Sequence, residues 1–330
     1  EAGARLQPLQ AVPVRTAARS STGPAPPGAR LPRPGSIAAW VLAARPATLP
    51  AAVVPVAIGA AVARREGTLL PGPVLGALAG ALLLQILSNL ANDVFDFERG
   101  ADTSARLGPP RAVQSGLLTP RAVRVGMAAV MGTLVGVGLY LAAVSSPWIV
   151  VAGVASILSA LAYTGGPFPI GYHGLGELFV FLFFGLVAVT GTTFVVLGTV
   201  PPLALFASVP PGTLAAAILV VNNVRDRDTD VLAGKRTLAV RWGRSAARLE
   251  YAGLVAIAYA TPVALWLLGL VGPLVLAPLS TLPLAGWRVL RLFVDEGRAL
   301  NRSLVGTAAL TLGFGLIFAA ALAFDGRDAG

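Results

Sequence analysis

Long apolar segments alternate with short polar segments along the chain after residue 45. A helix crosses the hydrocarbon core of a bilayer with about 17–25 apolar residues, and each of these segments reaches that length. The expected spans are residues 46–64, 73–97, 120–144, 147–163, 177–198, 207–226, 246–269, 272–292 and 302–324. The pattern therefore predicts an all-α polytopic membrane protein with nine transmembrane helices.

Residues 1–35 do not share this pattern. They are rich in Pro, Ala and Arg, and they contain no apolar run and no periodic spacing of apolar residues. A segment of this composition cannot bury a core, so we expect it to be disordered. Residues 36–330 are expected to form a single transmembrane domain.

The composition agrees with a membrane protein and excludes several kinds of site. Hydrophobic residues make up 55% of the chain and charged residues only 12%, whereas a soluble domain has about 25% charged residues. There is no cysteine and one histidine, His173, so disulfides, thiolate metal sites and His-based metal sites or triads are excluded. We expect His173 to be an ordinary loop residue.

The basic residues are distributed unevenly between the two sides of the predicted bundle. If the N-terminus is cytoplasmic, 22 of the 25 Lys and Arg residues lie on the cytoplasmic side. The positive-inside rule therefore predicts a cytoplasmic N-terminus. Because the basic residues lie in the gaps between apolar segments, they indicate topology and anionic lipid rather than nucleic acid.

The acidic residues form two clusters in a chain that is otherwise poor in acids. Each cluster lies at the end of an even-numbered predicted span, so both are expected to face the cytoplasm. Seven of the fifteen acidic residues belong to them: Asp93, Asp96, Glu98 and Asp102 in the first, and Asp226, Asp228 and Asp230 in the second. Ionisable groups at membrane depth are costly and usually functional.

The two clusters begin with the same spacing. Asn89 and Asp93 lie four positions apart, as do Asn222 and Asp226, and such positions share one helix face. Asp230 lies four positions after Asp226 and extends the second set. We call each set of Asn and Asp residues on one helix face an acidic stripe. A single acidic helix end is usually a solvated loop or a local salt bridge, but two matching ends favour one shared site.

The chemistry of such a site would suit a metal ion and a diphosphate. Oxygen ligands without His or Cys suit Mg²⁺, which binds a few carboxylates together with substrate phosphate oxygens. Cations that could bind phosphate oxygens surround the acids: Arg106, Arg111, Arg225, Lys235, Arg236 and Arg241. Metal and cations together can stabilise the charge of a departing pyrophosphate. The pattern therefore predicts a paired metal–diphosphate site.

At these residues the chain resembles the UbiA superfamily of intramembrane prenyltransferases. Within it, the chain is most similar to the branch that prenylates 1,4-dihydroxy-2-naphthoate in menaquinone biosynthesis. The resemblance rests on 45-RPATLPAAVVPVAIG-59, 92-NDVFDFERGADTSARLGPPRAVQSG-116, 163-YTGGPFPIGYHGLGE-177 and 222-NNVRDRDTDVLAGKRTLAVRWG-243. The last three predicted spans carry no diagnostic motif.

The resemblance implies both a fold, the UbiA-type helix bundle, and a reaction. A polyprenyl group would pass from polyprenyl diphosphate to 1,4-dihydroxy-2-naphthoate with loss of pyrophosphate and CO₂, giving demethylmenaquinone. The implied Mg²⁺ ligands are Asn89, Asp93, Asp226 and Asp230, with Asn222 and Asp96 close by, and the implied diphosphate-binding residues are Arg106, Arg111, Lys235 and Arg241. The enzyme would lie in the plasma membrane, with its active site facing the cytoplasm and the prenyl tail in lipid.

Five further residues have a functional interpretation beside a simpler one. Arg45 either snorkels to the interface or anchors the naphthoate carboxylate or the diphosphate. Tyr163 is either an interfacial aromatic or a π-face that shields a carbocation. Gln114 and Glu177 would contact the aromatic substrate or orient neighbouring groups. Asp102 would be a second-metal ligand or the base that deprotonates the acceptor.

Three other functions have similar ingredients. Within the superfamily, the acceptor could instead be 4-hydroxybenzoate or homogentisate. A CDP-alcohol phosphotransferase requires a compact Asp-Gly-x-x-Ala-Arg run, which the chain lacks. A divalent-cation transporter would place ionisable residues near the midplane, whereas here they gather at one face. Prenyl chain length and oligomeric state have no signature in the sequence.

Overall fold

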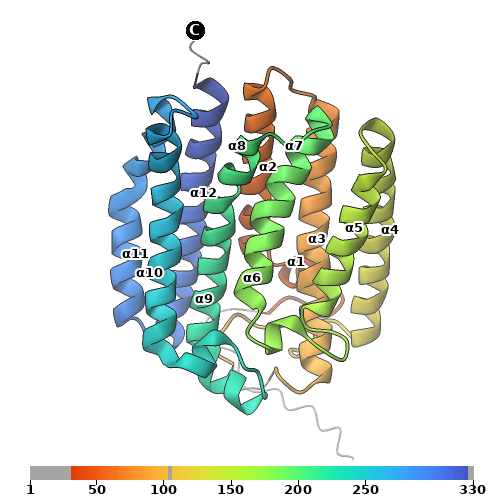
Figure 1. Ribbon diagram of the computed structural model, residues 1–330. Coiled ribbons are helices and arrows are strands. Elements are labelled where there is room, and N and C mark those ends of the chain that lie inside the picture. The colour runs from red at the N-terminus through yellow and green to blue at the C-terminus, as the bar shows by residue number, and fades with distance from the viewer. Residues whose placement is uncertain (1–30, 103–105, 326–330) are drawn as a thin grey trace, which may run out of the picture. The chain divides into compact units, whose positions relative to one another are not determined.

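Figure 1 shows the computed structural model, which describes residues 31–102 and 106–325. These residues form helices and loops and no strand. The α-helices are α1 (Ile37–Ala44), α2 (Pro50–Arg65), α3 (Pro71–Glu98), α4 (Pro120–Val144), α5 (Trp148–Ala162), α6 (Gly176–Phe181), α7 (Ala188–Leu197), α8 (Pro202–Ala207), α9 (Val209–Leu232), α10 (Leu238–Leu267), α11 (Leu282–Val294) and α12 (Leu300–Phe324). Shorter helical segments are η1 (Pro46–Thr48), η2 (Ile170–Tyr172), η3 (Leu182–Val187), η4 (Pro273–Thr281) and η5 (Gly297–Ala299). The all-α prediction is confirmed.

The predicted number of spans is only partly matched. Among the described residues, seven helical stretches are long and apolar enough to cross a membrane, and eight if the bent pair before residue 65 is one span. Helix α5 is apolar but has only 15 residues. A multi-pass helical membrane protein is therefore confirmed, while nine spans and a cytoplasmic N-terminus remain predictions. Most of the predicted disordered segment, residues 1–30, lies outside the described residues.

The first predicted span, residues 46–64, is a broken helix that begins earlier. Helix α1 starts after Ser36, whose hydroxyl accepts a hydrogen bond from the Ala39 amide, and the stretch 37–48 meets α2 at an angle of 53°. Arg45 has φ 52° in a left-handed conformation, the only non-glycine residue with positive φ among those described. Pro46 and Pro50 begin η1 and α2 and lack the amide hydrogen that would continue a preceding helix. The sequence pattern missed both α1 and the bend.

Helices α9 and α10 are each longer than their predicted spans. Helix α9 continues to Leu232, past the predicted end at 226, so the stripe up to Asp230 is entirely helical. Helix α10 begins at Leu238, with the Thr237 side chain as its cap, and is kinked at Gly243. The turn between them contains Gly234 at φ 71°, a conformation that suits glycine at a helix end. Lys235 is thereby brought back toward α9.

The predicted span 177–198 contains an irregular segment. Residues 182–187 of η3 form a π-helical turn between α6 and α7, a distortion that is frequent at functional sites. Gly185 of this turn packs closely on α9, because a Cβ there would lie 2.7 Å from the Ser208 carbonyl oxygen. The π turn therefore lies directly against the helix that carries the second acidic stripe.

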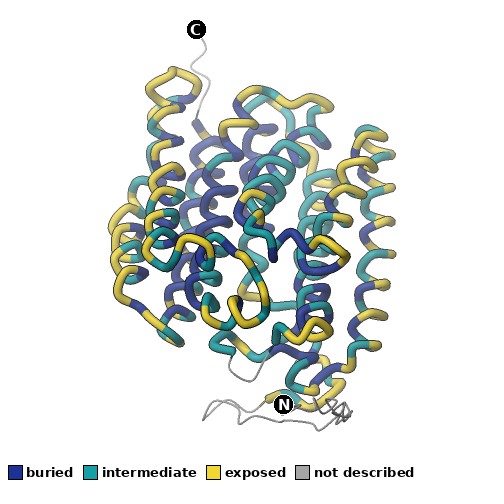
Figure 2. The backbone as a smooth tube through the Cα atoms, turned by 60° about the horizontal axis from the view of Figure 1, so that its bottom comes forward, coloured by how far each residue is buried: buried dark blue, intermediate teal, exposed yellow. Residues whose placement is uncertain are grey.

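Burial separates inner helices from outer helices. The apolar window of Pro202–Leu232 is 72% buried, whereas that of Pro120–Val144 is 17% buried. Figure 2 shows this contrast, with dark blue concentrated in the inner helices and yellow along the outer ones. The main core is formed by buried side chains of α2, α9, α10 and α12. The exposed apolar surface of α4 and α11 is consistent with helices that face lipid.

Candidate active site

The C-terminal ends of α3 and α9 and the α5–α6 connection lie at the same end of the bundle, at the bottom of Figure 1. Asp96 near the end of α3 is only 2% exposed. Its carboxylate accepts a hydrogen bond of 2.7 Å from the Tyr172 hydroxyl and one of 3.1 Å from Arg111 Nη2. Lys235 Nζ lies 3.4 Å from Asp96 Oδ1 and 3.8 Å from Asp230 Oδ1. One ammonium group therefore joins the two acidic helix ends.

Asp102 is paired with two guanidinium groups in the segment that follows α3. Arg106 Nη1 lies 2.8 Å and Arg111 Nε 3.4 Å from the two oxygens of its carboxylate. Burial raises the pKa of Asp102 to about 6, although the Arg106 charge acts in the opposite direction. This carboxylate therefore titrates close to neutral pH rather than near its usual value of about 3.9.

Asp93 faces the loop that carries Arg111. Its two carboxylate oxygens accept hydrogen bonds from the backbone amides of Ala112 at 3.0 Å and Val113 at 3.3 Å. The side chain is 1% exposed, so it holds this loop against α3 from a buried position. Asp93 thereby fixes where Arg111 meets Asp96.

The end of α9 is connected to α12 and to the segment after α3. Arg225 binds both oxygens of Asp226, at 2.8 and 2.6 Å, and also donates to Asn301 Oδ1 at 2.9 Å. The Asn301 amide donates to the Leu107 carbonyl at 2.9 Å. These contacts place Asp226 beside the 106–111 segment, which supplies the other cations of the site.

The α5–α6 connection covers the cluster through Tyr172. Lys235 Nζ lies 4.7 Å from the centre of the Tyr172 ring, within the range of a cation–π contact. Burial and the adjacent Asp96 carboxylate raise the pKa of Tyr172, so its hydroxyl remains a donor. Arg241 donates to the His173 carbonyl at 2.9 Å. Arg241 therefore contacts the α5–α6 connection. It forms no salt bridge with a carboxylate of the described residues.

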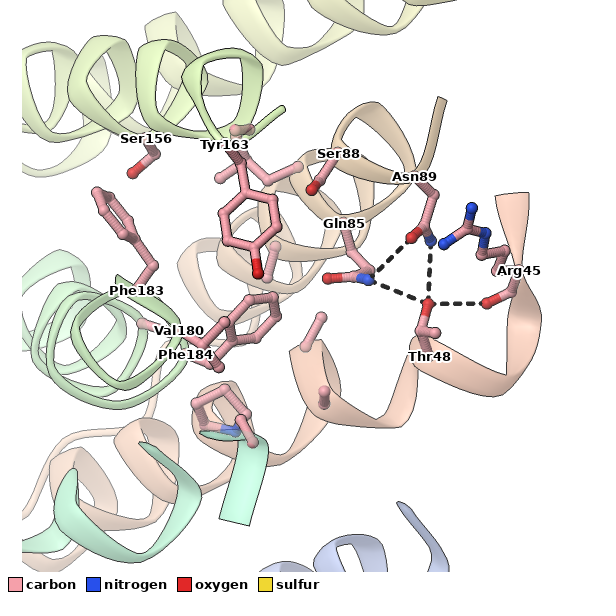
Figure 3. Close-up of a pocket in the computed structure, with 18 of the residues that line it drawn as sticks. Arg45, Thr48, Gln85, Ser88, Asn89, Ser156, Tyr163, Val180, Phe183 and Phe184 are labelled. Carbon is pink, nitrogen blue, oxygen red and sulfur yellow. Dashed lines mark hydrogen bonds between the residues drawn. The ribbon is translucent and has the colours of Figure 1, made fainter. Parts of the chain in front are cut away.

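An apolar cavity of about 730 Å³ begins beside this cluster. Arg106, Asn222 and Arg225 line it at the end next to the acidic residues. Its other walls are mostly apolar and come from α2, α3, α5, α7 and the π turn, where Phe183 and Phe184 project (Figure 3). The site thus combines a charged mouth with an apolar interior.

A network of neutral polar groups lies in one corner of the cavity (Figure 3). The Asn89 amide donates to the Ala44 carbonyl at 2.9 Å and to Thr48 Oγ1 at 3.0 Å. Gln85 Nε2 donates to the same hydroxyl at 3.0 Å and to Asn89 Oδ1 at 3.4 Å. Thr48 in turn donates to the Arg45 carbonyl at 2.9 Å. The bend between α1 and α2 is therefore bonded to the start of the first acidic stripe.

The remaining predicted site residues are divided between the cavity and its surroundings. Tyr163 lines the cavity. Glu177 does not line it, and accepts a hydrogen bond of 2.6 Å from Asn223. Gln114 lies in the turn after Arg111 and is also outside the cavity lining.

Sequence reasoning missed three contributors, Thr48, Gln85 and Asn301. Gln85 precedes Asn89 by one helical turn, so extension of the Asn-x-x-x-Asp stripe toward the membrane would have found it. Thr48 and Asn301 had no comparable signal, because their roles depend on the bend at Arg45 and on the approach of α12.

The described residues contain no group of three or more Asp, Glu, His or Cys side chains arranged to hold a metal ion. Cations lie between the carboxylates, since Lys235 separates Asp96 from Asp230 and Arg225 occupies both oxygens of Asp226. The predicted ligands are thus at one end of the bundle without converging on one point.

The UbiA prenyltransferase family matches residues 52–312, most of the chain and all of the cluster described above. The chain belongs to this family. A 1,4-dihydroxy-2-naphthoate octaprenyltransferase of Mycobacterium tuberculosis is 43% identical over 223 residues, which cover 68% of this chain and 76% of that protein. The Escherichia coli protein of the same name is 38% identical, over 66% of this chain and 72% of its own length.

Solved structures of UbiA homologues share the fold. The apo UbiA homologue of Aeropyrum pernix superposes with a TM-score of 0.66 at 16% identity, over 82% of this chain and 96% of its own. A UbiA homologue of Archaeoglobus fulgidus bound to GPP and Mg²⁺ has a TM-score of 0.59 at 17% identity, over 85% and 99%. At these identities the likeness establishes the UbiA fold.

Proposed function

We propose that this protein transfers the polyprenyl group of a polyprenyl diphosphate to 1,4-dihydroxy-2-naphthoate. The observation that carries the proposal is the meeting of the α3 and α9 acidic ends at Lys235, beside an apolar cavity of about 730 Å³. A charged mouth suits a diphosphate and an apolar interior suits a prenyl chain. The acceptor is proposed from the names of relatives in several bacteria.

The carboxylates and amides at the mouth fit Mg²⁺ together with a substrate diphosphate. Mg²⁺ rarely uses an all-protein cage and takes substrate phosphate oxygens as ligands. Asn89, Asn222 and the acidic stripes supply oxygen donors of the required kind, through Asp93, Asp96, Asp226 and Asp230. Once bound, the ion would neutralise charge on the diphosphate as it departs.

The cations of the site would hold the diphosphate. Arg106, Arg111 and Lys235 each contact a carboxylate in this structure, so they are already oriented toward the mouth. Phosphate oxygens would replace some of these carboxylate contacts, and the carboxylates would then become available as metal ligands. Arg241 would act from the α5–α6 connection, where it is bonded to His173.

The chemical step would take place where the cavity meets the mouth. Cleavage of the allylic C–O bond gives a carbocation and pyrophosphate, and the electron-rich naphthoate ring attacks the cation through carbon. The ring then loses a proton from the carbon that was attacked, and the carboxylate leaves as CO₂ with a proton taking its place on the ring. Arg45, whose Nη2 is buried without a hydrogen bond in the described residues, would hold the acceptor carboxylate, and Tyr163 would present its ring to the cation.

The proposed enzyme lies in the bacterial plasma membrane, with the N-terminus and the active site on the cytoplasmic side. The uneven distribution of Lys and Arg supports this orientation. Both acidic helix ends lie at one end of the bundle (Figure 1), so a diphosphate would reach them from the aqueous side while its tail remains in the apolar cavity.

An acceptor competition in membranes tests the proposal. Membranes that contain the protein are incubated with Mg²⁺, a polyprenyl diphosphate and each aromatic acid, and prenylated product and CO₂ are measured by mass. We expect product from 1,4-dihydroxy-2-naphthoate and none after Asp93→Ala or Asp226→Ala. Asp228→Asn is the matched control, because Asp228 is 68% exposed and paired only with surface arginines among the described residues. Product from 4-hydroxybenzoate alone would disprove the acceptor, and near-normal activity of either alanine variant would disprove the site.

A further inference from the structure

The polar corner of the cavity contains an acceptor atom that no protein group uses. Gln85 Oε1 is buried and accepts no hydrogen bond from the described residues. A buried carbonyl oxygen without a partner costs free energy, and such exceptions in a folded protein call for an explanation. We propose that Gln85 is a specificity-determining residue whose Oε1 accepts a hydrogen bond from a ring hydroxyl of the aromatic acceptor. The inference rests on the proposed function and adds to it a residue and the group that this residue recognises.

The orientation of the Gln85 amide is fixed by its neighbours. Thr48 gives its only hydroxyl proton to the Arg45 carbonyl, and the Asn89 amide nitrogen is committed to the Ala44 carbonyl. Thr48 Oγ1 and Asn89 Oδ1 therefore present only lone pairs to Gln85, and these must face Nε2. A flipped amide would place oxygen against oxygen at both contacts. Oε1 is consequently the atom that remains free.

The free oxygen lies on the far side of this network from Arg45. In Figure 3 the Gln85 carbonyl oxygen points away from Arg45, into the side of the cavity from which Tyr163 extends. Arg45 Nη2 is the second buried group of the corner without a hydrogen bond in the described residues. The corner thus offers a cationic donor on one side and a neutral acceptor on the other. Both atoms are covered by neighbouring side chains, so a ligand would reach them by displacing these.

A hydroxylated aromatic acid has the complementary pair of groups. Its carboxylate matches Arg45, and a hydroxyl elsewhere on the ring matches Gln85 Oε1. In 1,4-dihydroxy-2-naphthoate the 1-hydroxyl is adjacent to the carboxylate and donates to it internally. The 4-hydroxyl has no such internal partner, so it is the group assigned to Gln85. Donation from this hydroxyl also increases electron density in the ring, which favours attack on a carbocation.

The test compares two ligands that differ only in this hydroxyl. Dissociation constants of 4-hydroxy-2-naphthoate and 2-naphthoate are measured on the full-length purified protein by calorimetry. We expect the wild-type protein to bind the hydroxylated ligand about tenfold more tightly, the effect of one hydrogen bond to a buried partner. In Gln85→Met, which keeps the length of the side chain but removes the acceptor, the ratio should fall to about one.

Gln85→Glu is the matched control. Both substitutions remove the Nε2 donor that serves Thr48 and Asn89. Glutamate also places a second oxygen against these two acceptors, so it disturbs the network at least as much as methionine does, but it retains an oxygen acceptor at the position of Oε1. We expect the Glu variant to keep the preference for the hydroxylated ligand, even if its charge weakens the binding of both carboxylates. A preference that survives in Gln85→Met, or that is absent from the wild-type protein, would overturn the inference and would indicate that water satisfies the oxygen.

Turnover of 1,4-dihydroxy-2-naphthoate, measured in parallel, separates this inference from the proposed function. Turnover together with an unchanged ligand ratio in Gln85→Met refutes only the role of Gln85. A ratio that depends on Gln85 without turnover of this acceptor refutes only the proposed reaction.

Discussion

Asp93 and Asp102 are both buried, but different partners stabilise their carboxylates. Asp93 accepts hydrogen bonds from two consecutive backbone amides, which are fixed dipoles that cost little to organise. Asp102 is opposite two guanidinium groups, those of Arg106 and Arg111, and burial still raises its pKa to about 6. Asp93 is therefore held in position by the backbone of the loop after Arg111, and Asp102 is a carboxylate that can change charge near neutral pH.

Protonation of Asp102 should lower the activity of the protein and increase its free energy of unfolding. Below about pH 6 the carboxyl is protonated in the folded protein, so it can no longer act as a base or pair with Arg106, and kcat/KM should fall. Because its folded pKa is raised above the usual value of about 3.9, the folded state binds more protons between these pH values. The contribution of Asp102 to the free energy of unfolding therefore increases as pH falls through this window and is lost as pH rises through 6.

The comparison of wild-type protein with Asp102→Asn checks this prediction. The pH profiles of kcat/KM and of the thermal midpoint are measured for both. The Asn variant should have low activity without an acidic limb near pH 6, and a thermal midpoint that is less dependent on pH in this window. An unchanged limb in the variant would assign the titration to another group.

The charged residues of the site were visible in the sequence because charge is rare in this chain. Gln85 and Thr48 were not, because a neutral polar side chain in an apolar helix does not stand out. Their importance depends on which atoms remain unpaired, and this depends on the left-handed conformation of Arg45. No local pattern encodes that geometry.

At the scale of elements, apolar segments predicted where helices occur better than where they begin and end. The predicted span 207–226 ended too early because the apolar period stops there, although the helix continues to Leu232. Contacts from Arg225 and Lys235 stabilise this last part of the helix. The break before Pro50 was missed because apolar residues lie on both sides of it, so hydropathy alone does not mark it. Tertiary contacts and prolines, rather than hydropathy, decide these boundaries.

The close packing of α2 on α12 depends on a glycine. A Cβ at Gly315 would lie 2.2 Å from Val54 Cγ1 and 3.1 Å from Val54 Cβ, and the latter cannot be relieved by rotation of the valine. We therefore expect Gly315→Ala to lower the thermal midpoint by several degrees, corresponding to about 1–3 kcal/mol for overpacking. Gly313→Ala on the same helix meets no atom within 4 Å and should be neutral or slightly stabilising. Equal midpoints for the two variants would contradict this role of Gly315.

At the scale of the whole molecule, the two ends of the bundle differ in how their charges are used. Arg65 and Arg64 are two of the few basic residues assigned to the outer side. Arg65 Nη1 lies 3.2 Å from Asp325 Oδ2, and the side chains are 9% and 6% exposed. This buried pair connects α2 to the end of α12, and Arg64 lies over the Phe324 ring. These two arginines therefore have structural partners at their own end of the bundle.

Cysteine labelling in sealed vesicles should establish the orientation directly. The chain contains no cysteine, so each single substitution provides the only reactive thiol. Asp228 is 68% exposed at the acidic end, and Thr199 is exposed in the connection between α7 and α8 at the other end. With a membrane-impermeant maleimide, Thr199→Cys should react in right-side-out vesicles and Asp228→Cys only in inverted ones, because the positive-inside rule places the acidic end in the cytoplasm. The reverse result would place the active site on the outer side, and reaction of both in one preparation would contradict opposite ends for these residues.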